Sequence, residues 1–412
     1  MMTKVRLASF SKNRVKVISY GMSIIAAMLI FCSSIFAALP QVSGGGSHSL
    51  VLKSDGTVWT WGGNHAGQLG DGTTDQRKFA VEVKGLEDVV SVAAGWEHNL
   101  AVKSDGTVWA WGNNRFGQLG DGTDKDRSVP VRVKIIKDVT DIDAGFYHSV
   151  ALQSDGTVWV WGNNELDQLG NGTKSDANKP IQVQRLNNVV AVSSGNHHNL
   201  ALKADGTLWA WGANGYGQLG DGTIMESSIL TPVSNFNGAI SIVSGNNFNL
   251  ALKADGTVWG WGMNTYGQFG NGTKTDSRVP IQINELDNII AIVTGGYHAL
   301  ALQADGTVLS TGYNRTGQLG IGTTSNYKYT TLKVHGIGDV ISIGAGYYHS
   351  LALKHDGTVW AWGNNEYGQL GDGTLNYRKL PVRLSIILDQ TVKTTPKEKN
   401  ASAITPIPSP AK

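Results

Sequence analysis

Cysteine and charged residues are scarce in this sequence, and each shortage excludes a class of protein. Cys32 is the only cysteine among 412 residues. It lies in an N-terminal segment that we expect to be removed, so disulfides and thiol chemistry play no part in the mature chain. Charged residues make up 16% of the sequence, against 53 glycines and 13 tryptophans. Helical proteins usually carry more charge, and disordered chains usually carry fewer aromatic residues. The composition therefore indicates an ordered, turn-rich β protein.

The chain also lacks a surplus of positive charge beyond its first 37 residues. That segment contains no acid and five basic residues, which are Lys4, Arg6, Lys12, Arg14 and Lys16. The whole chain has a net charge of +2, so removing these five charges leaves −3. A nucleic-acid-binding surface needs basic side chains to neutralise phosphates. We therefore expect no nucleic-acid partner.

The N-terminal segment has the pattern of an export signal. A basic stretch ending at Lys16 precedes a largely apolar run from Ile24 to Phe36, and Ala37-Ala38 follows as a cleavage site. The sequence predicts a signal peptide over residues 1–38 and a secreted or cell-surface protein. The alternative is an uncleaved anchor, because Val17 to Leu39 is about long enough for the roughly 20 residues that cross a bilayer. Only in that case do we expect membrane attachment.

An internal repeat dominates the rest of the chain. One series of seven Asp-Gly-Thr triplets is spaced 50 residues apart five times and then 51. The triplets begin at Asp55, Asp105, Asp155, Asp205, Asp255, Asp305 and Asp356. Fixed periods of this length are typical of repeat architectures. The seven units leave no room for a separate globular domain.

One repeat unit predicts four short strands. Residues 89–93, 98–104 and 107–111 read as three strands, with the tight turn Asp105-Gly106 between the second and third. Residues 129–133 read as the fourth, and Pro130 fits a strand end or sheet edge. A turn centred on Asp105-Gly106 pairs His98 with Asn113. Four strands in each of seven units predict an all-β, seven-bladed β-propeller over residues 39–390.

Tryptophans two residues apart support this architecture, because side chains at that spacing share one face of a strand. Six units carry such a pair, which can pack against the neighbouring blade. The pairs are Trp59/Trp61, Trp109/Trp111, Trp159/Trp161, Trp209/Trp211, Trp259/Trp261 and Trp360/Trp362. The sixth unit has Leu309 and Thr311 instead. We therefore predict looser packing in that layer.

Three motifs carry a resemblance to a known family. The repeated Gly-Gln-Leu-Gly, Trp-Gly-x-Asn and Gly-x-x-His-x-Leu-Ala-Leu sequences resemble the regulator of chromosome condensation repeat family across the whole expected mature chain. The resemblance implies a seven-bladed propeller whose ring is closed by pairing of the two chain ends, with residues 381–392 helping to complete it. Residues 391–412, rich in Pro, Lys, Ser and Thr, read as a disordered tail.

The recurring polar residues favour structural roles over metal or cofactor binding. Histidine recurs at His48, His98, His148, His198, His298 and His349, with Phe248 in the remaining unit. Stacked sheets lie roughly 10 Å apart, whereas metal ligands sit about 2 Å from the ion, so we predict buried histidines that tie a strand to a loop. A second series reads Asp71, Asp121, Asn171, Asp221, Asn271, Ile321 and Asp372. An isoleucine and two amides suit calcium poorly, and turns stabilised by Asx side chains explain the series. We expect no metal, no cofactor and no catalytic residue.

The positions that vary between repeats point to a binding face. Two variable pairs per unit, such as Trp96-Glu97 and Arg115-Phe116, should emerge at the end of the blade opposite the Asp-Gly turn. Variable, aromatic-rich loops on a rigid scaffold are typical of recognition surfaces. The alternative is that these residues only plug the channel or cover the strand ends. The predicted face comprises Trp96, Glu97, Arg115, Phe116, Phe146, Tyr147, His197, Tyr216, Tyr266, Tyr297, Tyr347, Tyr348 and Tyr367.

Three functions compete at this stage. The first is a non-catalytic, monomeric extracellular scaffold for a protein or a cell-wall component. It is similar to secreted bacterial members of the fold, some of which inhibit β-lactamases, although those inhibitors lack the regular turns seen here. The second is guanine-nucleotide exchange on a small GTPase, which the export signal and the absence of an inserted wedge oppose. The third is a secreted inhibitor of a cell-wall-related enzyme or a carbohydrate-active propeller. Glu97, Glu165 and Glu366 lie in separate units and form no carboxylate pair.

Overall fold

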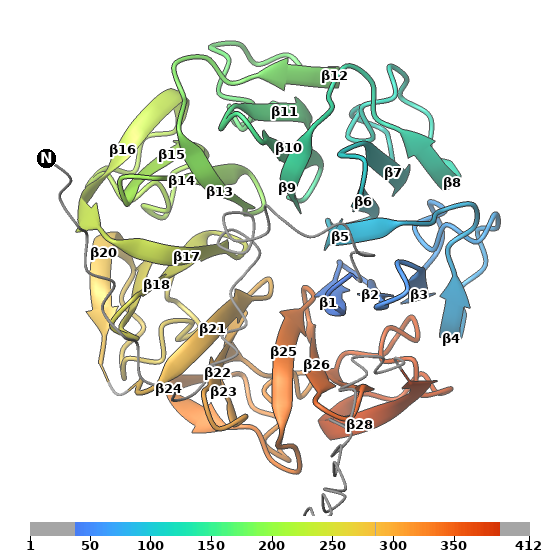
Figure 1. Cartoon of the computed structure of the whole chain (residues 1–412). Coiled ribbons are helices and arrows are strands. Elements are labelled where there is room, and N and C mark those ends of the chain that lie inside the picture. Colours follow the sequence, from blue (N-terminus) through green and yellow to red (C-terminus); the bar gives the residue numbers. More distant parts are fainter. Residues whose placement is uncertain (1–37, 285, 388–412) are drawn as a thin grey trace, which may run out of the picture.

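The computed structural model describes residues 38–284 and 286–387, which form a ring of seven four-stranded antiparallel sheets around a central channel (Figure 1). This is the expected seven-bladed β-propeller. The predicted signal peptide (residues 1–38, apart from Ala38) and the predicted tail (391–412) lie outside the described residues. No helix among the described residues is long and apolar enough to cross a membrane.

Each blade contains four strands that are consecutive in the chain, with the first innermost. Blades 1 to 4 contain β1 (Gln41–Gly44), β2 (His48–Leu52), β3 (Val58–Gly62) and β4 (Arg77–Glu82); β5 (Val89–Ala94), β6 (His98–Lys103), β7 (Val108–Gly112) and β8 (Arg127–Arg132); β9 (Val139–Ala144), β10 (His148–Gln153), β11 (Val158–Gly162) and β12 (Ala177–Gln182); and β13 (Val189–Ser194), β14 (His198–Lys203), β15 (Thr207–Gly212) and β16 (Ser227–Asn237). Blades 5 to 7 contain β17 (Ala239–Ser244), β18 (Phe248–Lys253), β19 (Val258–Gly262) and β20 (Ser277–Ile283); β21 (Ile289–Thr294), β22 (His298–Gln303), β23 (Val308–Tyr313) and β24 (Tyr327–Lys333); and β25 (Val340–Ala345), β26 (His349–Lys354), β27 (Thr358–Gly363) and β28 (Arg378–Ile387).

The hairpin between the second and third strands differs by one residue from the register expected from the sequence. His98 pairs with Gly112 and not with Asn113. The loop contains three residues and not two, since the amide of Lys103 donates to the carbonyl of Thr107 at 2.9 Å. Gly106, at φ +75°, takes the left-handed position that such a loop needs at its last residue. The variable pairs nevertheless emerge at the expected end of the blade.

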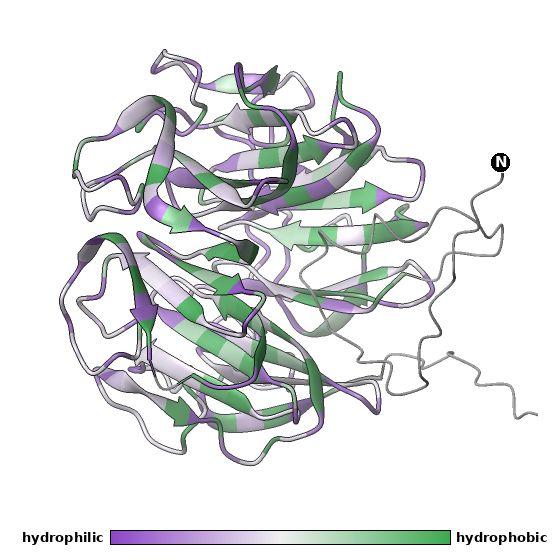
Figure 2. Ribbon diagram, turned by 60° about the vertical axis from the view of Figure 1, so that its left-hand side comes forward, coloured by the Kyte–Doolittle hydropathy of each residue, from purple (hydrophilic) through white to green (hydrophobic). Residues whose placement is uncertain are grey.

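The hydrophobic core is divided into layers between neighbouring blades, and hydrophobic residues concentrate in the strands (Figure 2). The second tryptophan of each pair is fully buried there, as with Trp161, which packs against Leu119 and Val133 of the preceding blade. Its indole nitrogen donates to the carbonyl of Gln118 at 2.8 Å. Burying a large aromatic side chain removes 150–250 Å² from water, in order of magnitude, so these side chains dominate the packing between blades.

The layer between blades 5 and 6 is packed more loosely, as predicted from the missing tryptophan pair. Thr311 lies where the buried tryptophan stands in the other blades, and its hydroxyl donates to the carbonyl of Gly267 at 2.8 Å. A cavity of about 20 Å³ remains there, lined by Phe269, Ile283 and Leu309 among others. Such a volume is enough for about one water molecule.

The expectation that the ring closes by pairing of the two chain ends is wrong. Among the described strands, β1 pairs with β2 alone and β28 with β27 alone, so each blade forms its own four-stranded sheet. Instead, β1 packs against β25 and β26 (Figure 1). The indole of Trp61 donates to the carbonyl of Gln369 at 2.8 Å, the same contact that joins most other neighbouring blades. Within the described residues each sheet takes its four strands from one repeat unit, with β1 innermost in the first blade and β28 outermost in the seventh.

A belt of main-chain hydrogen bonds also joins the blades at the perimeter. In every blade the glycine after the Gly-Gln-Leu-Gly loop donates its amide to the outer strand of the next blade, as Gly72 does to Ser128 at 2.8 Å. Gly373 donates to Lys78 at 3.1 Å and so closes the belt between blades 7 and 1. Ring closure therefore repeats the contacts found around the ring and needs no special element.

Candidate functional site

The candidate site lies on the end of the ring where the loops after the inner strands meet the loops after the third strands. We call this end the mouth face, and the end with the Asp-Gly-Thr turns the turn face. Ring contacts show that the two loop sets meet, since Phe116 follows β7 and its ring centroid lies 5.0 Å from that of Tyr147, which precedes β10. The mouth face therefore carries both variable pairs of every repeat, as predicted.

The first residue of each inner pair is directed to the central channel. Trp96, Phe146 and Tyr347 line its narrow end, together with main-chain atoms of all seven blades around a cavity of about 90 Å³. Trp96 stacks on Phe146 at 4.5 Å between centroids and meets Tyr347 edge-on at 4.6 Å. Asn246 donates to the hydroxyl of Tyr347 at 3.0 Å. These three aromatic residues close the channel from blades 2, 3 and 7.

The second residue of each inner pair lies farther from the channel axis, half-buried on the mouth face. Tyr147 packs edge-on against Phe146 and also contacts Phe116. His197 lies 5.8 Å from Phe146 between ring centroids. The guanidinium of Arg115 lies 5.6 Å from the Phe116 ring, within the range of a cation–π contact. These residues extend the aromatic surface over blades 2, 3 and 4.

Four tyrosines, Tyr266, Tyr297, Tyr313 and Tyr348, continue this surface over blades 5 to 7; we call them the tyrosine cluster. Tyr266 contacts Tyr297 at 5.1 Å and Tyr313 at 5.4 Å, and Tyr348 contacts Tyr313 at 5.8 Å. Tyr347 joins the cluster to the channel aromatics through Tyr297, at 5.3 Å. Ring pairs at these distances favour edge-on or offset arrangements. The aromatic side chains thus form one continuous arc from Phe116 to Tyr266.

Tyr313 was missed by the sequence analysis, which considered only the two variable pairs. It directly follows the glycine of the third strand, where the other units have Gly63, Asn113, Asn163, Ala213, Met263 and Asn364. A large aromatic residue at a position that is otherwise small, polar or flexible was the available signal. Tyr313 is the single aromatic residue at this position of the repeat.

Burial keeps four tyrosines of the mouth face neutral at ordinary pH. Burial raises the pKa of Tyr348 to about 12, and the nearby Tyr297, Tyr313 and Tyr266 add to this effect. Burial likewise raises the pKa of Tyr147, Tyr313 and Tyr347, and lowers the pKa of His197. These four phenols therefore offer neutral hydroxyl donors and acceptors on the mouth face.

The remaining predicted residues lie on the same face but stand apart from the arc. Glu97 pairs with His65 at 2.8 Å, so its carboxylate is engaged within the protein. Tyr216 and Tyr367 are each 43% exposed, on blades 4 and 7. Neither makes a ring contact with another aromatic side chain of the described part of the chain. The structure thus brings ten of the thirteen predicted residues together in or beside one arc, and three lie outside it.

A groove adjoins the arc at the rim between blades 2 and 3. Its volume is about 410 Å³, and Arg115 and Phe116 form one wall while Asp176, Lys179 and Pro180 form part of the other. Phe116 belongs to both the groove and the aromatic arc. A partner lying on the arc can therefore extend into the groove without crossing a gap.

Beneath the face lies a ring of six fully buried histidines, the histidine collar: His48, His98, His148, His198, His298 and His349. Each bonds through Nε2 to an Asn or Ser of the next blade, as His148 does to Asn199 at 2.9 Å. Asn199 in turn donates to the carbonyl of Gln168 at 2.8 Å, which leaves its Oδ1 to accept from the histidine. The prediction that these histidines tie a strand to a loop is wrong in its detail, because the bond joins strands of neighbouring blades.

Each collar histidine is held in its neutral form. Burial is the largest cause, and it lowers the pKa of His48 and His198 to about 4 and that of the other four to about 3. A Cβ on Gly95 would lie 2.4 Å from Cε1 of His98, so the collar also requires glycine at the end of the inner strand. In the fifth unit Phe248 replaces the histidine, and Ala299 replaces its partner. These features mark the collar as structural.

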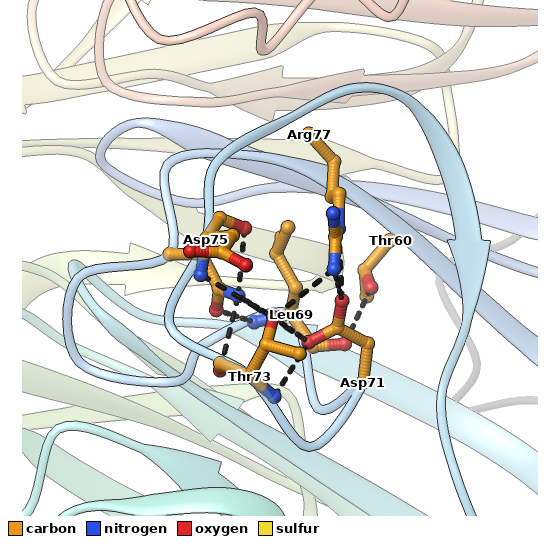
Figure 3. Close-up of polar contacts among 7 residues, drawn as sticks. Thr60, Leu69, Asp71, Thr73, Asp75 and Arg77 are labelled. Atoms are coloured by element: carbon orange, nitrogen blue, oxygen red, sulfur yellow. Dashed lines mark hydrogen bonds and ion pairs between the residues drawn. The ribbon is translucent and has the colours of Figure 1, made fainter.

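The second series, which begins with Asp71 in the loop after the third strand, forms side-chain-stabilised turns, as predicted. Asp71 accepts from the amide and the hydroxyl of Thr73 at 2.9 and 2.7 Å, and its other oxygen accepts from Arg77 at 2.8 and 2.9 Å (Figure 3). Burial alone would raise the pKa of Asp71, but the bonds from Thr73 and Arg77 outweigh it and lower that pKa. Asn64 donates across the same loop to the carbonyls of Thr73 and Asp75. No group of three His, Cys, Asp or Glu side chains in the described ranges could hold a metal ion.

Comparisons with known proteins agree with this architecture. The family model of the RCC1-like domain matches residues 32–324, and models of the regulator of chromosome condensation (RCC1) repeat match residues 305–353, 340–369 and 356–395. The resemblance seen in the sequence motifs is confirmed.

Two solved structures share the fold over most of this chain. Prp20p from Saccharomyces cerevisiae is 26% identical and has a TM-score of 0.74, with 83% of this chain and 88% of that chain covered. Human WBSCR16 is 24% identical, has a TM-score of 0.73 and covers 80% of this chain and 94% of its own. Among curated proteins, the mitochondrial RCC1 domain-containing protein RUG3 from Arabidopsis thaliana is 38% identical over 53 residues. That match covers 13% of this chain and 12% of the relative.

Proposed function

The chain belongs to the family of RCC1-like domains, and we propose that it is a non-catalytic scaffold that binds a protein partner through the aromatic arc of its mouth face. The observation that carries this proposal is the continuity of the arc. Its rings come from six of the seven blades, and they touch one another from Phe116 to Tyr266. Aromatic residues supply large, rigid contact areas and are enriched among the residues that dominate binding energy.

The contrast between the two ends of the ring supports this choice of surface. The turn face repeats the same Asp-Gly-Thr turn in every blade, whereas the mouth face differs from blade to blade. Side chains that are the same in every repeat maintain the fold, whereas binding of a specific partner requires residues that differ between repeats. The groove beside Phe116 adds a concave feature to that surface.

A binding experiment with four alanine variants tests the proposal. Trp96→Ala, Phe146→Ala, Tyr147→Ala and Tyr348→Ala should each weaken capture of the partner, because a central aromatic contact is worth about 2 kcal/mol or more, roughly a 30-fold loss of affinity. Tyr147 and Tyr348 are the most informative, since they lie outside the channel closure. Tyr329→Ala is the matched control: Tyr329 is 47% exposed but lies on the outer strand β24. Unchanged capture by all four face variants would refute the proposal.

We also propose an extracellular or cell-surface location, on the strength of the N-terminal export pattern alone. Fractionation of the source cells with an antibody to the propeller tests this point. Recovery of the protein outside the cell, shortened at the N-terminus, is the expected result. Recovery only in the cytosol would contradict it and would favour the alternative below.

Guanine-nucleotide exchange on a small GTPase is the second candidate. It is favoured by the similarity to Prp20p, whose structure was reported with its binding properties to Gsp1p and histones. A direct exchange assay with small GTPases of the source organism separates the candidates. Faster nucleotide release with the propeller, lost in the face variants, would support exchange. No acceleration, together with binding of another protein, would support the scaffold.

A further inference from the structure

Six of the seven interfaces between blades contain the same set of three hydrogen-bonded contacts. A buried tryptophan donates to a glutamine carbonyl of the preceding blade at 2.8–3.1 Å. A collar histidine bonds to an Asn or Ser of the next blade at 2.7–3.0 Å. A perimeter glycine donates to the next outer strand at 2.8–3.2 Å. This repetition makes the interfaces directly comparable.

The interface between blades 5 and 6 retains only the perimeter contact among the described residues. Thr311 replaces the tryptophan, and its hydroxyl bonds to Gly267 and not to Gln268. Phe248 and Ala299 replace the histidine and its partner, so an apolar contact takes the place of the collar bond at this interface. The carbonyl of Gln268 therefore receives neither of the two side-chain bonds that its counterparts receive.

The interior of the same interface is also incompletely packed. Phe269 stands where the other six blades have leucine, so its larger ring fills part of the space left by the missing indole. The cavity of about 20 Å³ shows that the space is not completely filled. The side-chain amide of Gln268 is buried without a partner, as is that of Gln318 in blade 6, because Met263 and Tyr313 stand where Asn113 accepts this bond from Gln118. A buried donor without a partner weakens the closed arrangement.

The main-chain hydrogen bonds that remain at this interface lie near the channel and the perimeter, while its interior is held by the Thr311–Gly267 bond and by apolar packing around Phe248. Gly272 donates to Tyr329 at 2.7 Å at the perimeter, and Asn246 donates to Gly296 at 3.1 Å near the channel. On the mouth face, Tyr266 of blade 5 packs against Tyr297 and Tyr313 of blade 6. Water competes with hydrogen bonds at the surface, whereas each of the other interfaces also has a tryptophan bond and a histidine bond in its dry interior. At the interface between blades 5 and 6, one threonine hydroxyl and apolar packing take the place of these two buried bonds.

We infer that the ring opens first at the interface between blades 5 and 6, which acts as a built-in opening point of the propeller. Opening separates Tyr266 from Tyr297 and Tyr313, so it divides the tyrosine cluster. A partner that binds across this cluster would hold the opening point closed, because a ligand that binds only the closed form stabilises it. This consequence rests on the proposed function, but the opening point itself does not.

Native-state hydrogen exchange on the full chain, without any partner, tests the inference. Gly272 and Asn246 report on the interface between blades 5 and 6, and Gly222 and Asn196 make the equivalent bonds between blades 4 and 5. We expect the amides of Gly272 and Asn246 to exchange at least 10-fold faster than those of Gly222 and Asn196. Equal or slower exchange would overturn the inference. Either result leaves the binding proposal to its own test.

Two variants that restore the missing contacts provide the second arm. Phe248→His/Ala299→Asn restores the collar bond, and Thr311→Trp/Phe269→Leu restores the pair found in the other blades. Each should slow exchange at Gly272 toward the rate at Gly222. If one of these variants does not fold, the wild-type comparison and the other variant still test the inference. If both folded variants leave the exchange rate at Gly272 unchanged, the inference is wrong.

The matched control weakens a normal interface in the same way. His198→Phe/Asn249→Ala places the Phe–Ala pair of the opening point between blades 4 and 5, where the tryptophan contact remains. Exchange at Gly222 should then accelerate while exchange at Gly272 stays the same. Acceleration at Gly272 but not at Gly222 would contradict the assignment of these contacts to individual interfaces.

Discussion

Lowering the pH from 7.5 to 5.5 should destabilise the propeller strongly, because of the histidine collar. Burial holds the pKa of each collar histidine at about 3 to 4, whereas an unfolded histidine has a pKa of 6.5. A base whose pKa is lowered on folding binds protons only in the unfolded state over this range. Folding stability is therefore complete above the unfolded pKa and falls as the pH drops toward the folded pKa.

The size of the effect follows from linkage. At pH 5.5 each unfolded histidine gains about 1.4 kcal/mol from protonation, so six of them remove about 8 kcal/mol of stability. Two buried aspartates act in the opposite direction. Burial raises the pKa of Asp141 to about 7, with the charge of Asp143 adding to it, and burial raises that of Asp143 to about 6. Their protonation in the folded state returns about 3 kcal/mol over the same range, which leaves a net loss of about 5 kcal/mol.

Chemical denaturation at several pH values between 5.5 and 7.5 measures this loss. The variant His198→Phe/Asn249→Ala isolates one histidine, because it reproduces the apolar pair that the fifth unit already has at Phe248 and Ala299. Its stability should fall by about 1.4 kcal/mol less than that of the wild type over this range. A measurement at pH 8 controls for its effect on packing. Identical pH dependence in variant and wild type would refute the role assigned to the collar.

Three further predictions concern stability. Trp161→Ala should cost about 3–5 kcal/mol in the free energy of unfolding, whereas Trp159→Ala, at the half-buried position of the same strand, should cost clearly less; equal losses in denaturant titrations would contradict the layer packing. Asp71→Ala should cost about 1–3 kcal/mol by leaving Thr73 and Arg77 without their acceptor, measured as a drop in Tm; an unchanged Tm would show that this turn network contributes nothing. Asp141→Asn/Asp143→Asn should raise the free energy of unfolding at pH 8 but not at pH 5. At pH 8 both carboxyls are ionised, and each unit by which folding raises a carboxyl pKa then costs about 1.4 kcal/mol. A stability difference that does not change with pH would exclude ionisation of these aspartates as its cause.

The repeat period predicted the blades because each unit contains all the information that a blade needs. Residues 89–93, 98–104, 107–111 and 129–133 were expected as strands, and β5 to β8 lie within two residues of these ranges. The loose sixth layer was also predictable, since Leu309 and Thr311 break the tryptophan pair in the sequence itself. These successes depend on local patterns that one strand or one hairpin determines.

Contacts between blades were harder to predict, because they join residues about 51 positions apart. The partner of His148 is Asn199, and nothing within one repeat indicates that pairing. The prediction of how the ring closes was wrong for the same reason, since it depends on which strands of the first and seventh blades meet. The joint replacement of a histidine and its partner by Phe248 and Ala299 was a usable signal, but its meaning required the geometry.

The sequence placed the variable residues at one end of the blades, but it could not predict which of them close the channel and which lie on the open surface. Whether a loop side chain turns toward the channel, as Trp96 does, or outward, as Tyr147 does, depends on the bend after the inner strand. Sequence alternation assigns faces only within a regular strand. The sequence could therefore place these residues on one end of the ring but could not separate the channel closure from the open surface.

Site-specific photo-crosslinking in the source cells tests the central claim most directly. A photoreactive residue is placed at Tyr147 or Tyr348 on the mouth face, or at Asp205 on the turn face as the control. Both mouth-face positions should give the same single protein adduct, and Asp205 should give none. Adding Trp96→Ala to the Tyr348 probe should abolish the adduct. Adducts formed mainly at Asp205, or mouth-face adducts that persist unchanged with Trp96→Ala, would contradict the claim.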